Sequence, residues 1–177
     1  MRKDERTAQP CTPGGRGRAS SPTTPSIAEV TTKRQPTIVS IGYEGRTLDE
    51  LIALLLTHDV DMLVDVRLNP ISRRQGFSKT SLAQALDAAG IGYRHERELG
   101  NPRDNRDGFR RGLKSAHSRY ARHLQNGASE VYREVVELVH TVRPALLCVE
   151  RDLQECHRSS ILETARADFP DLRVIDV

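Results

Sequence analysis

One segment near the end of the chain gathers residue types that commonly do chemistry. A short apolar run, residues 146–149, leads to Glu150, and a connector then leads to Cys156, His157 and Arg158. This segment places a carboxylate at the end of a buried strand and a thiol, an imidazole and a guanidinium where a helix begins. Burying such groups together is costly unless the site binds an anion or carries out a reaction. The segment therefore indicates a functional site, but it does not identify a substrate.

Several roles are open for the Cys-His-Arg sequence. If Cys156 lies in the first turn of the last helix, the free amides and the helix dipole favour its thiolate, and His157 and Arg158 add positive charge. The spacing differs from the Cys-x5-Arg loop of phosphatases, because Arg158 follows Cys156 after a single residue. We expect Arg158 and the helix terminus to bind an anion, with Cys156 and His157 as structural or catalytic support. Covalent catalysis by Cys156 is the alternative.

Metal binding is a further alternative, since Cys148, Cys156, His157 and His95 offer four ligands. However, the spacing Cys-x7-Cys-His matches no standard structural zinc pattern, and a mid-strand Cys148 is expected to point into the core rather than towards the rim. A serine nucleophile is disfavoured because no glycine-flanked serine follows a strand. We therefore predict no bound metal and no cofactor.

The elements that position these residues alternate regularly from residue 37 onwards. Short β-branched or leucine-rich runs predict five strands, at residues 37–41, 62–66, 91–95, 145–149 and 172–175. Amphipathic stretches between them predict helices, and the last of these is expected to run from Cys156 or His157 to Asp168. This alternation predicts an α/β fold: a three-layer, Rossmann-like arrangement of a mostly parallel sheet of about five strands with helices on both faces.

Local signals refine these helices. Thr47 and Glu50 predict a capping box at the start of the first helix, and Gly90 is expected to close the second helix in a left-handed conformation. Residues 99–114 are charged and contain glycine and proline, so we predict a loop there. Helical stretches are expected to follow at residues 115–124 and 129–142.

Polar residues follow the other predicted strands as well. The carboxyl ends of parallel strands meet at one edge of a sheet, where ligands usually bind. The candidates at this edge are Gly42 and Tyr43 after the first strand, Asp65, Arg67 and Arg73 after the second, and Tyr93 and His95 in the third. Asp65 and Arg67 point to the same face, so either they pair with each other or the arginine binds a ligand. A tight turn at Gly42 and a structural His95 are the simpler alternatives.

Composition limits the class of protein. Residues 1–36 are rich in Pro, Gly, Ser, Thr and charge, which predicts a disordered N-terminal tail before a single α/β domain at residues 37–177. The formal charge is +3, but the tail carries seven Lys/Arg against three acidic residues, so the domain is nearly neutral. Its one basic stretch is residues 94–122.

Three cysteines predict no disulfide framework. The absence of a signal sequence or an apolar span predicts a cytoplasmic protein with no membrane partner.

The motifs together resemble the family called domain of unknown function 488. The matching stretches are residues 41–45, 63–67, 72–73, 76–79, 90–91 with Tyr93 and His95, 99–100, and 147–150 with 156–158. The resemblance covers residues 37–177 and implies a compact bacterial-type α/β domain whose polar motifs belong to one site. It implies no settled activity, substrate or cofactor, and residues 101–103 depart from many relatives.

These observations favour an enzyme, a hydrolase or a transferase, that acts on a phosphate-bearing or otherwise anionic substrate such as a nucleotide or nucleic acid. Arg67, Arg73 and Arg158 would hold negative charge, Glu150 would be the acid/base, and Cys156 or His157 would assist. The alternative is a non-catalytic module that binds nucleotide or nucleic acid through the basic stretch. An aromatic content of 4% with no Trp provides few stacking platforms for such a module. The oligomeric state is not predicted.

Overall fold

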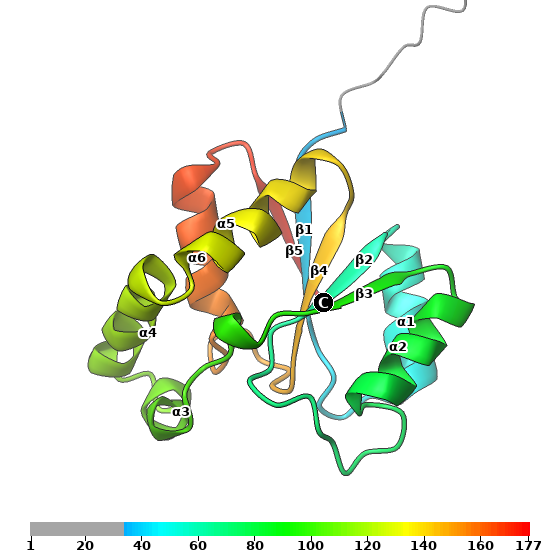
Figure 1. The fold of residues 1–177 in the computed structure, drawn as a ribbon, viewed down its shortest axis with the longest axis horizontal. Coiled ribbons are helices and arrows are strands. Elements are labelled where there is room, and N and C mark those ends of the chain that lie inside the picture. The colour runs from blue at the N-terminus through cyan, green and yellow to red at the C-terminus, as the bar shows by residue number, and fades with distance from the viewer. Residues whose placement is uncertain (1–33) are drawn as a thin grey trace, which may run out of the picture. The chain divides into compact units, whose positions relative to one another are not determined.

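Five parallel strands form one sheet in the computed structural model, which describes residues 34–177 of the chain (Figure 1). The strands are β1 (Thr37–Gly42), β2 (Met62–Asp65), β3 (Gly92–His95), β4 (Pro144–Cys148) and β5 (Arg173–Asp176), in the order β3-β2-β4-β1-β5. All four strand pairings are parallel. The predicted tail, residues 1–36, lies outside the described residues except for its last three.

Helices cover both faces of the sheet, which confirms the predicted three-layer, Rossmann-like α/β fold (Figure 1). One face is covered by α1 (Leu48–Thr57) and α2 (Lys79–Ala88). The other is covered by α3 (Arg103–Arg110), α4 (Lys114–Asn126), α5 (Ser129–Glu137) and α6 (Arg158–Asp168). Strands β1 and β4 are buried on both faces, and for this reason their sequences are mostly apolar and do not alternate between apolar and polar residues.

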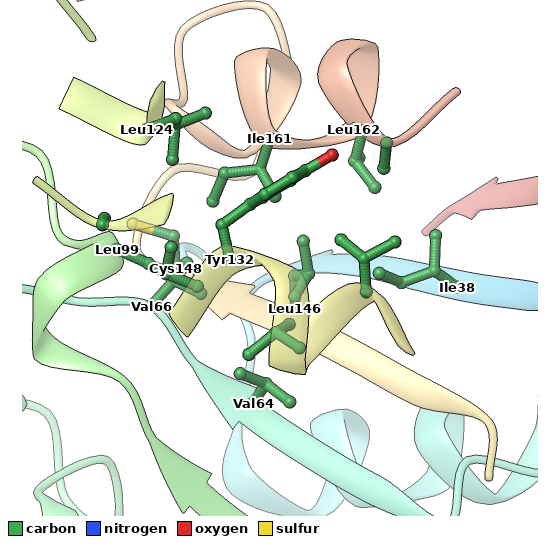
Figure 2. Close-up of a cluster of buried hydrophobic side chains, with 14 of the residues drawn as sticks. Ile38, Val64, Val66, Leu99, Leu124, Tyr132, Leu146, Cys148, Ile161 and Leu162 are labelled. Atoms are coloured by element: carbon green, nitrogen blue, oxygen red, sulfur yellow. The ribbon is translucent and has the colours of Figure 1, made fainter. Parts of the chain in front are cut away.

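The side chains of the three central strands, β2, β4 and β1, divide between two cores. On the α1/α2 face, Val39, Leu63 and Leu147 pack against helix leucines such as Leu51 and Leu82. On the opposite face, the strand residues pack against α4, α5 and α6, and Figure 2 shows Val66, Leu146 and Cys148 within this second cluster. Cys148 is therefore a core residue, and it is also the last residue of β4.

Two local predictions about helix ends are confirmed. The Thr47 hydroxyl accepts a hydrogen bond from the Glu50 amide, and the Glu50 carboxylate accepts one from the Thr47 amide, so the capping box is complete. Gly90 follows α2 with a φ of +74°, the left-handed conformation that glycine adopts at low cost.

Two predictions about the middle of the chain are wrong. Residues 99–114 are not a loop, because α3 occupies Arg103–Arg110 after a 3₁₀ turn at Arg97–Leu99. Its buried Phe109 stacks on the ring of His117 and meets Tyr120 edge-to-face, so tertiary packing stabilises a helix that has almost no apolar periodicity. The helix predicted over residues 129–142 is shorter, since α5 ends at Glu137 and a 3₁₀ turn follows.

The strand order places β4 at a topological switch point. The chain leaves β1 and β2 towards α1 and α2 on one face, whereas it leaves β4 towards α6 on the other face. Because β4 lies between β2 and β1, the loop after it diverges from the loops on both sides. Divergence of this kind opens a crevice at the carboxyl edge of a parallel sheet, where ligands bind in this fold class.

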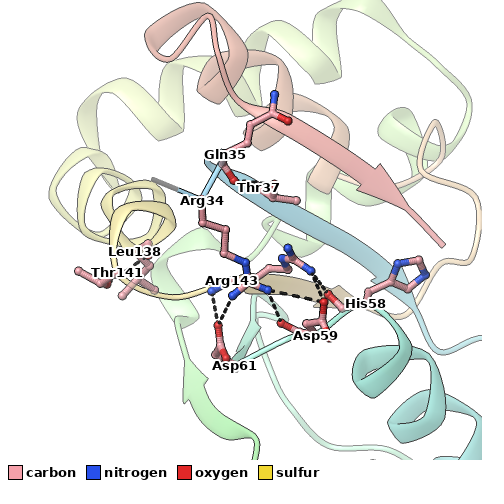
Figure 3. A network of polar contacts seen from close by, with 9 residues as sticks. All are labelled: Arg34, Gln35, Thr37, His58, Asp59, Asp61, Leu138, Thr141 and Arg143. Atoms are coloured by element: carbon pink, nitrogen blue, oxygen red, sulfur yellow. Dashed lines mark hydrogen bonds and ion pairs between the residues drawn. The ribbon is translucent and has the colours of Figure 1, made fainter. Parts of the chain in front are cut away.

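A different polar network lies at the amino ends of β2 and β4 (Figure 3). Arg143, just before β4, donates to the carbonyl oxygen of His58 at 2.6 Å and to the Asp59 carboxylate at 3.0 Å, and its amide donates to Asp61. Arg34 also pairs with Asp61. This network links the segments that enter β2 and β4, at the edge of the sheet remote from the predicted site.

No helix within residues 34–177 has both the length and the apolar character required to cross a bilayer.

Candidate functional site

A small cavity of about 80 Å³ opens at the carboxyl ends of β2 and β4. Its walls come from the loop after β2, from α3 and the turn before it, and from the segment that joins β4 to α6. The lining residues are Arg67, Leu68, Asn69, Asn101, Arg106, Arg110, Cys148, Val149, Glu150, Glu155 and His157. The cavity therefore lies at the switch point and contains part of the predicted site.

Two thiols and an imidazole form a buried cluster at the floor of this cavity. The Nδ1 atom of His157 lies 3.8 Å from the sulfur of Cys148 and 3.8 Å from the sulfur of Cys156. All three side chains are buried, but Cys148 and His157 line the cavity whereas Cys156 does not. Cys148 is a core residue, as the sequence predicts, but it is the last residue of β4 rather than a mid-strand one, and it also lines the cavity at the rim of the sheet.

The other nitrogen of His157 fixes the orientation of its ring. Nε2 lies 3.0 Å from the carbonyl oxygen of Val66, which can only accept, so Nε2 carries a proton. Nδ1 is then the nitrogen that faces both sulfurs and can hold or release the second proton. This contact also joins the segment before α6 to the end of β2, which lie far apart in the sequence.

Arg158 supports the cluster from beneath and does not line the cavity. Its side chain is fully buried and donates to the Ser40 hydroxyl at 2.9 Å, to the Glu150 carbonyl oxygen at 2.6 Å and to the Cys156 sulfur at 3.2 Å. Among residues 34–177 no carboxylate forms an ion pair with it. The Cys156 thiolate is therefore the group near enough to balance this buried charge.

The surroundings shift the acidities of these groups in opposite directions. Burial opposes ionisation of Cys156, but the neighbouring Cys148 thiol and the charges of His157 and Arg158 outweigh it and lower the pKa of Cys156 well below its ordinary value. The neighbouring Cys156 sulfur, together with burial, raises the pKa of Cys148, whose single proton is donated to Glu150. Burial lowers the pKa of His157, but the Cys156 charge outweighs it and the net shift is upward. The cluster thus favours a thiolate at Cys156.

The groups that stabilise the Cys156 thiolate differ from those that the sequence predicts. Helix α6 begins at Arg158 with His157 as its N-cap, so Cys156 precedes the helix and does not lie in its first turn. The side chains around the sulfur, rather than helix amides, provide the stabilisation.

Glu150 forms one wall of the cavity and is held in place by two neighbours. Arg110 donates to its Oε1 atom at 2.9 Å, and the Cys148 thiol donates to Oε2 at 3.1 Å. Burial raises the pKa of Glu150, but the hydrogen bonds from its own backbone, Arg110 and Cys148 outweigh this and lower it to about 2. Glu150 is therefore a carboxylate at neutral pH.

The sequence reasoning missed the residues that α3 brings to the cavity. Arg106 and Arg110 lie four residues apart and share one face of α3, and the Nε atom of Arg106 donates to the carbonyl oxygen of Asn101. Asn69 and Glu155 were also missed. The one available signal was the basic stretch at residues 94–122, which contains both arginines but does not show which of them face the sheet.

Several predicted ligand-binding residues instead form a closed network beside the cavity. Arg67 is buried, and its guanidinium donates to the Asp65 carboxylate from Nε and Nη2, and to the Phe77 carbonyl oxygen and the Tyr43 hydroxyl from Nη1. Of the two interpretations of Asp65 and Arg67, the structure has the ion pair. Tyr43 is buried and stacks on Phe77.

Tyr93 and His95 belong to the same network. The Tyr93 hydroxyl donates to Asp65 at 2.7 Å, and the Nε2 atom of His95 lies 2.9 Å from the carbonyl oxygen of Arg67. Neither residue lines the cavity. Both therefore hold the end of β2 in position, and through Arg67 they support one wall of the cavity.

The two remaining candidates differ in their relation to the site. A Cβ atom added to Gly42 would lie 1.9 Å from the carbonyl oxygen of Glu150, so the glycine allows the ends of β1 and β4 to approach closely. Arg73 is exposed on the loop before α2 and does not line the cavity. The structure thus brings together Arg67, Cys148, Glu150 and His157 at the cavity, with Cys156 and Arg158 directly behind them.

Comparison with known proteins identifies a family. The model of "Domain of unknown function DUF488" matches residues 47–165, which include the end of β2, α3, Glu150 and the Cys-His-Arg segment. Neither the comparison with curated proteins nor the comparison with solved structures finds a match.

Proposed function

The chain belongs to the DUF488 family, and we propose that it is an enzyme acting on a small anionic substrate, with a phosphate-bearing compound such as a nucleotide as the best-fitting class. The reaction would be a hydrolysis or a group transfer at the cavity after β4. The observation that carries this proposal is one cavity with the Glu150 carboxylate and three arginines on its walls, two of them partly exposed on α3, and a Cys-His cluster at its floor.

Arg106 and Arg110 are the residues suited to bind the anion. Arg106 has no carboxylate partner within residues 34–177, and Arg110 pairs with Glu150 while about half of its side chain stays exposed. Guanidinium groups bind phosphate and carboxylate oxygens through paired, charge-assisted hydrogen bonds. Arg67 and Arg158 would act indirectly, because each is buried and bonded to protein groups.

Glu150 is the group best suited to move a proton. Its carboxylate lines the cavity and is oriented on one side by Arg110 and on the other by Cys148. With a pKa of about 2 the free carboxylate is a weak base. An anionic substrate that takes over Arg110 would raise this pKa towards the range in which Glu150 accepts a proton from water or from a substrate hydroxyl. His157 and Cys148 would assist from the floor, whereas Cys156 would act through them, because only 1% of it is exposed.

The dimensions of the cavity limit the part of the substrate that enters it. A volume of about 80 Å³ accommodates a single phosphate- or carboxylate-sized group rather than a whole nucleotide. The rest of the substrate would then lie outside, over the exposed side chains of α3 and the loop at Glu155.

The test is turnover of a mixture of phosphate-bearing metabolites by the wild type and by the Glu150→Gln variant. We expect Glu150→Gln to bind the same compound and to lose roughly a hundred-fold or more in turnover, the usual contribution of a general acid or base. Glu134→Gln is the matched control, since Glu134 is an exposed residue of α5 that pairs with Arg94 of β3. Full turnover by Glu150→Gln would contradict the proposed role.

A binding module for nucleic acid is less well supported, because three of the nine Lys/Arg residues in the basic stretch pair with carboxylates of the protein itself. Arg94 pairs with Glu96 and Glu134, Arg110 with Glu150, and Arg119 with Asp104. Binding to a phosphate backbone would appear as an affinity that falls steeply with salt and does not respond to Glu150→Gln.

A further inference from the structure

We propose that Cys148, Cys156 and His157 form a binding site for a divalent metal ion of the zinc type, with a fourth coordination position that faces the cavity. The proposal is independent of the proposed function, because a metal can be bound and measured whether or not a substrate is turned over. It also departs from the sequence-based expectation that no metal is bound.

The distances between the three side chains suit tetrahedral coordination. The His157 Nδ1 atom lies 3.8 Å from each sulfur, and the three ligand atoms all lie within 4.8 Å of one another. With usual Zn–S and Zn–N bond lengths, an ideal tetrahedron separates sulfur and nitrogen by about 3.6 Å. Small side-chain movements would therefore bring both sulfurs and the imidazole nitrogen to bonding distance of one ion.

The neighbours of the cluster are those expected around metal ligands. A metal-bound histidine usually donates its other N–H to a backbone carbonyl or a carboxylate, which fixes the ring and leaves the first nitrogen free to coordinate. Here His157 Nε2 donates to the Val66 carbonyl oxygen at 3.0 Å. Arg158 Nε donates to the Cys156 sulfur at 3.2 Å, a contact that suits a coordinated thiolate.

The charges of the cluster also suit a divalent cation. A divalent ion with two thiolates and a neutral imidazole has no net charge, and it releases the protons that the thiols and the imidazole hold without metal. The ion would thereby allow both sulfurs to be ionised in a buried position.

The fourth coordination position would face the cavity because two of the three ligands line it. Cys148 and His157 line the cavity, and Cys156 lies behind them. Glu150 stands beside the cluster, with its Oε2 atom 3.1 Å from the Cys148 sulfur. Three protein ligands and one open position next to a carboxylate are typical of catalytic zinc sites rather than of structural ones.

The first experiment measures metal in the full-length protein. The chain is produced in medium supplemented with zinc, purified with a reductant and without chelators, and analysed by mass spectrometry for metals. We expect about one zinc ion per chain for the wild type and less than about a tenth of that for Cys148→Ser, Cys156→Ser and His157→Gln. Cys11→Ser and His123→Gln serve as matched controls and should retain the metal.

A second experiment does not depend on whether the variants fold. Cobalt added to the metal-free wild type should give the intense charge-transfer absorption of thiolate-bound Co²⁺ and should be displaced by zinc. The proposal is overturned if the wild type binds neither ion, if the three ligand variants keep the metal, or if Cys148 and Cys156 are found joined as a disulfide in protein purified with reductant. Glu150→Gln should keep the metal and lose turnover, so failure of this proposal is distinguishable from failure of the proposed function.

Discussion

The Nε atom of Arg67 lies 2.8 Å from the Oδ1 atom of Asp65, and both side chains are almost completely buried. We expect Asp65→Asn to lower the free energy of unfolding by about 3–5 kcal/mol, because it leaves the Arg67 charge without its partner. Unfolding in urea measures this loss. Asp104→Asn is the matched control: it breaks a pair with Arg119 that is largely exposed, so little change is expected. Equal effects of the two variants would show that the buried pair has no special role.

Gly42 tests the close approach of β1 to the segment that carries Glu150. Gly42→Ala should destabilise the protein by roughly 3 kcal/mol or more, because the new Cβ would lie 1.9 Å from a backbone oxygen. In Gly90→Ala the added Cβ meets no atom within 4 Å, so only the left-handed backbone is strained and a loss of about 1–2 kcal/mol is expected. Thermal unfolding of both variants checks the difference, and a smaller loss for Gly42→Ala would contradict this account.

Stability should fall at alkaline pH. Burial, with Asp65 nearby, raises the pKa of Tyr93, and burial, with a hydrogen bond to Asp168, raises the pKa of Tyr132. The unfolded chain loses these protons at about pH 10, whereas the folded chain keeps them. The folded state then binds more protons, so the stabilisation is complete below about pH 10 and is lost as the pH rises above it.

The absorbance of ionised tyrosine measures this effect. We expect Tyr93 and Tyr132 to ionise together with unfolding rather than before it, and Tyr132→Phe should make stability fall less steeply with pH. Ionisation of all four tyrosines at their ordinary pKa in the folded protein would be incompatible with the prediction.

The layers of the fold and the location of the site follow directly from the sequence. Short runs rich in β-branched residues or leucine, such as residues 37–41 and 145–149, identify buried parallel strands, and parallel strands bring the residues after them to one edge. Glu150 and Arg67, which are far apart in the chain, accordingly line one cavity.

The composition of the site was harder to predict, for two physical reasons. Helix α3 depends on the packing of Phe109 rather than on its own periodicity, so the pattern of residues 99–114 hid the arginines that face the cavity. The strand order cannot be read from the sequence, and it is the position of β4 beside β2 that brings His157 against Val66 and Cys148 to the cavity floor.

The most direct measurement of the central claim identifies, by mass spectrometry, the compounds that the purified protein retains from a cell extract. It compares the wild type with a double variant that carries Arg106→Gln and Arg110→Gln. The account predicts that the wild type retains a phosphate-bearing compound and that the double variant retains roughly ten- to a hundred-fold less, the effect of losing charge-assisted hydrogen bonds. Arg111→Gln, on an exposed residue just after α3, should behave like the wild type. Equal retention by the wild type and the double variant, or no anionic compound with either, would contradict the claim that this cavity binds an anionic substrate.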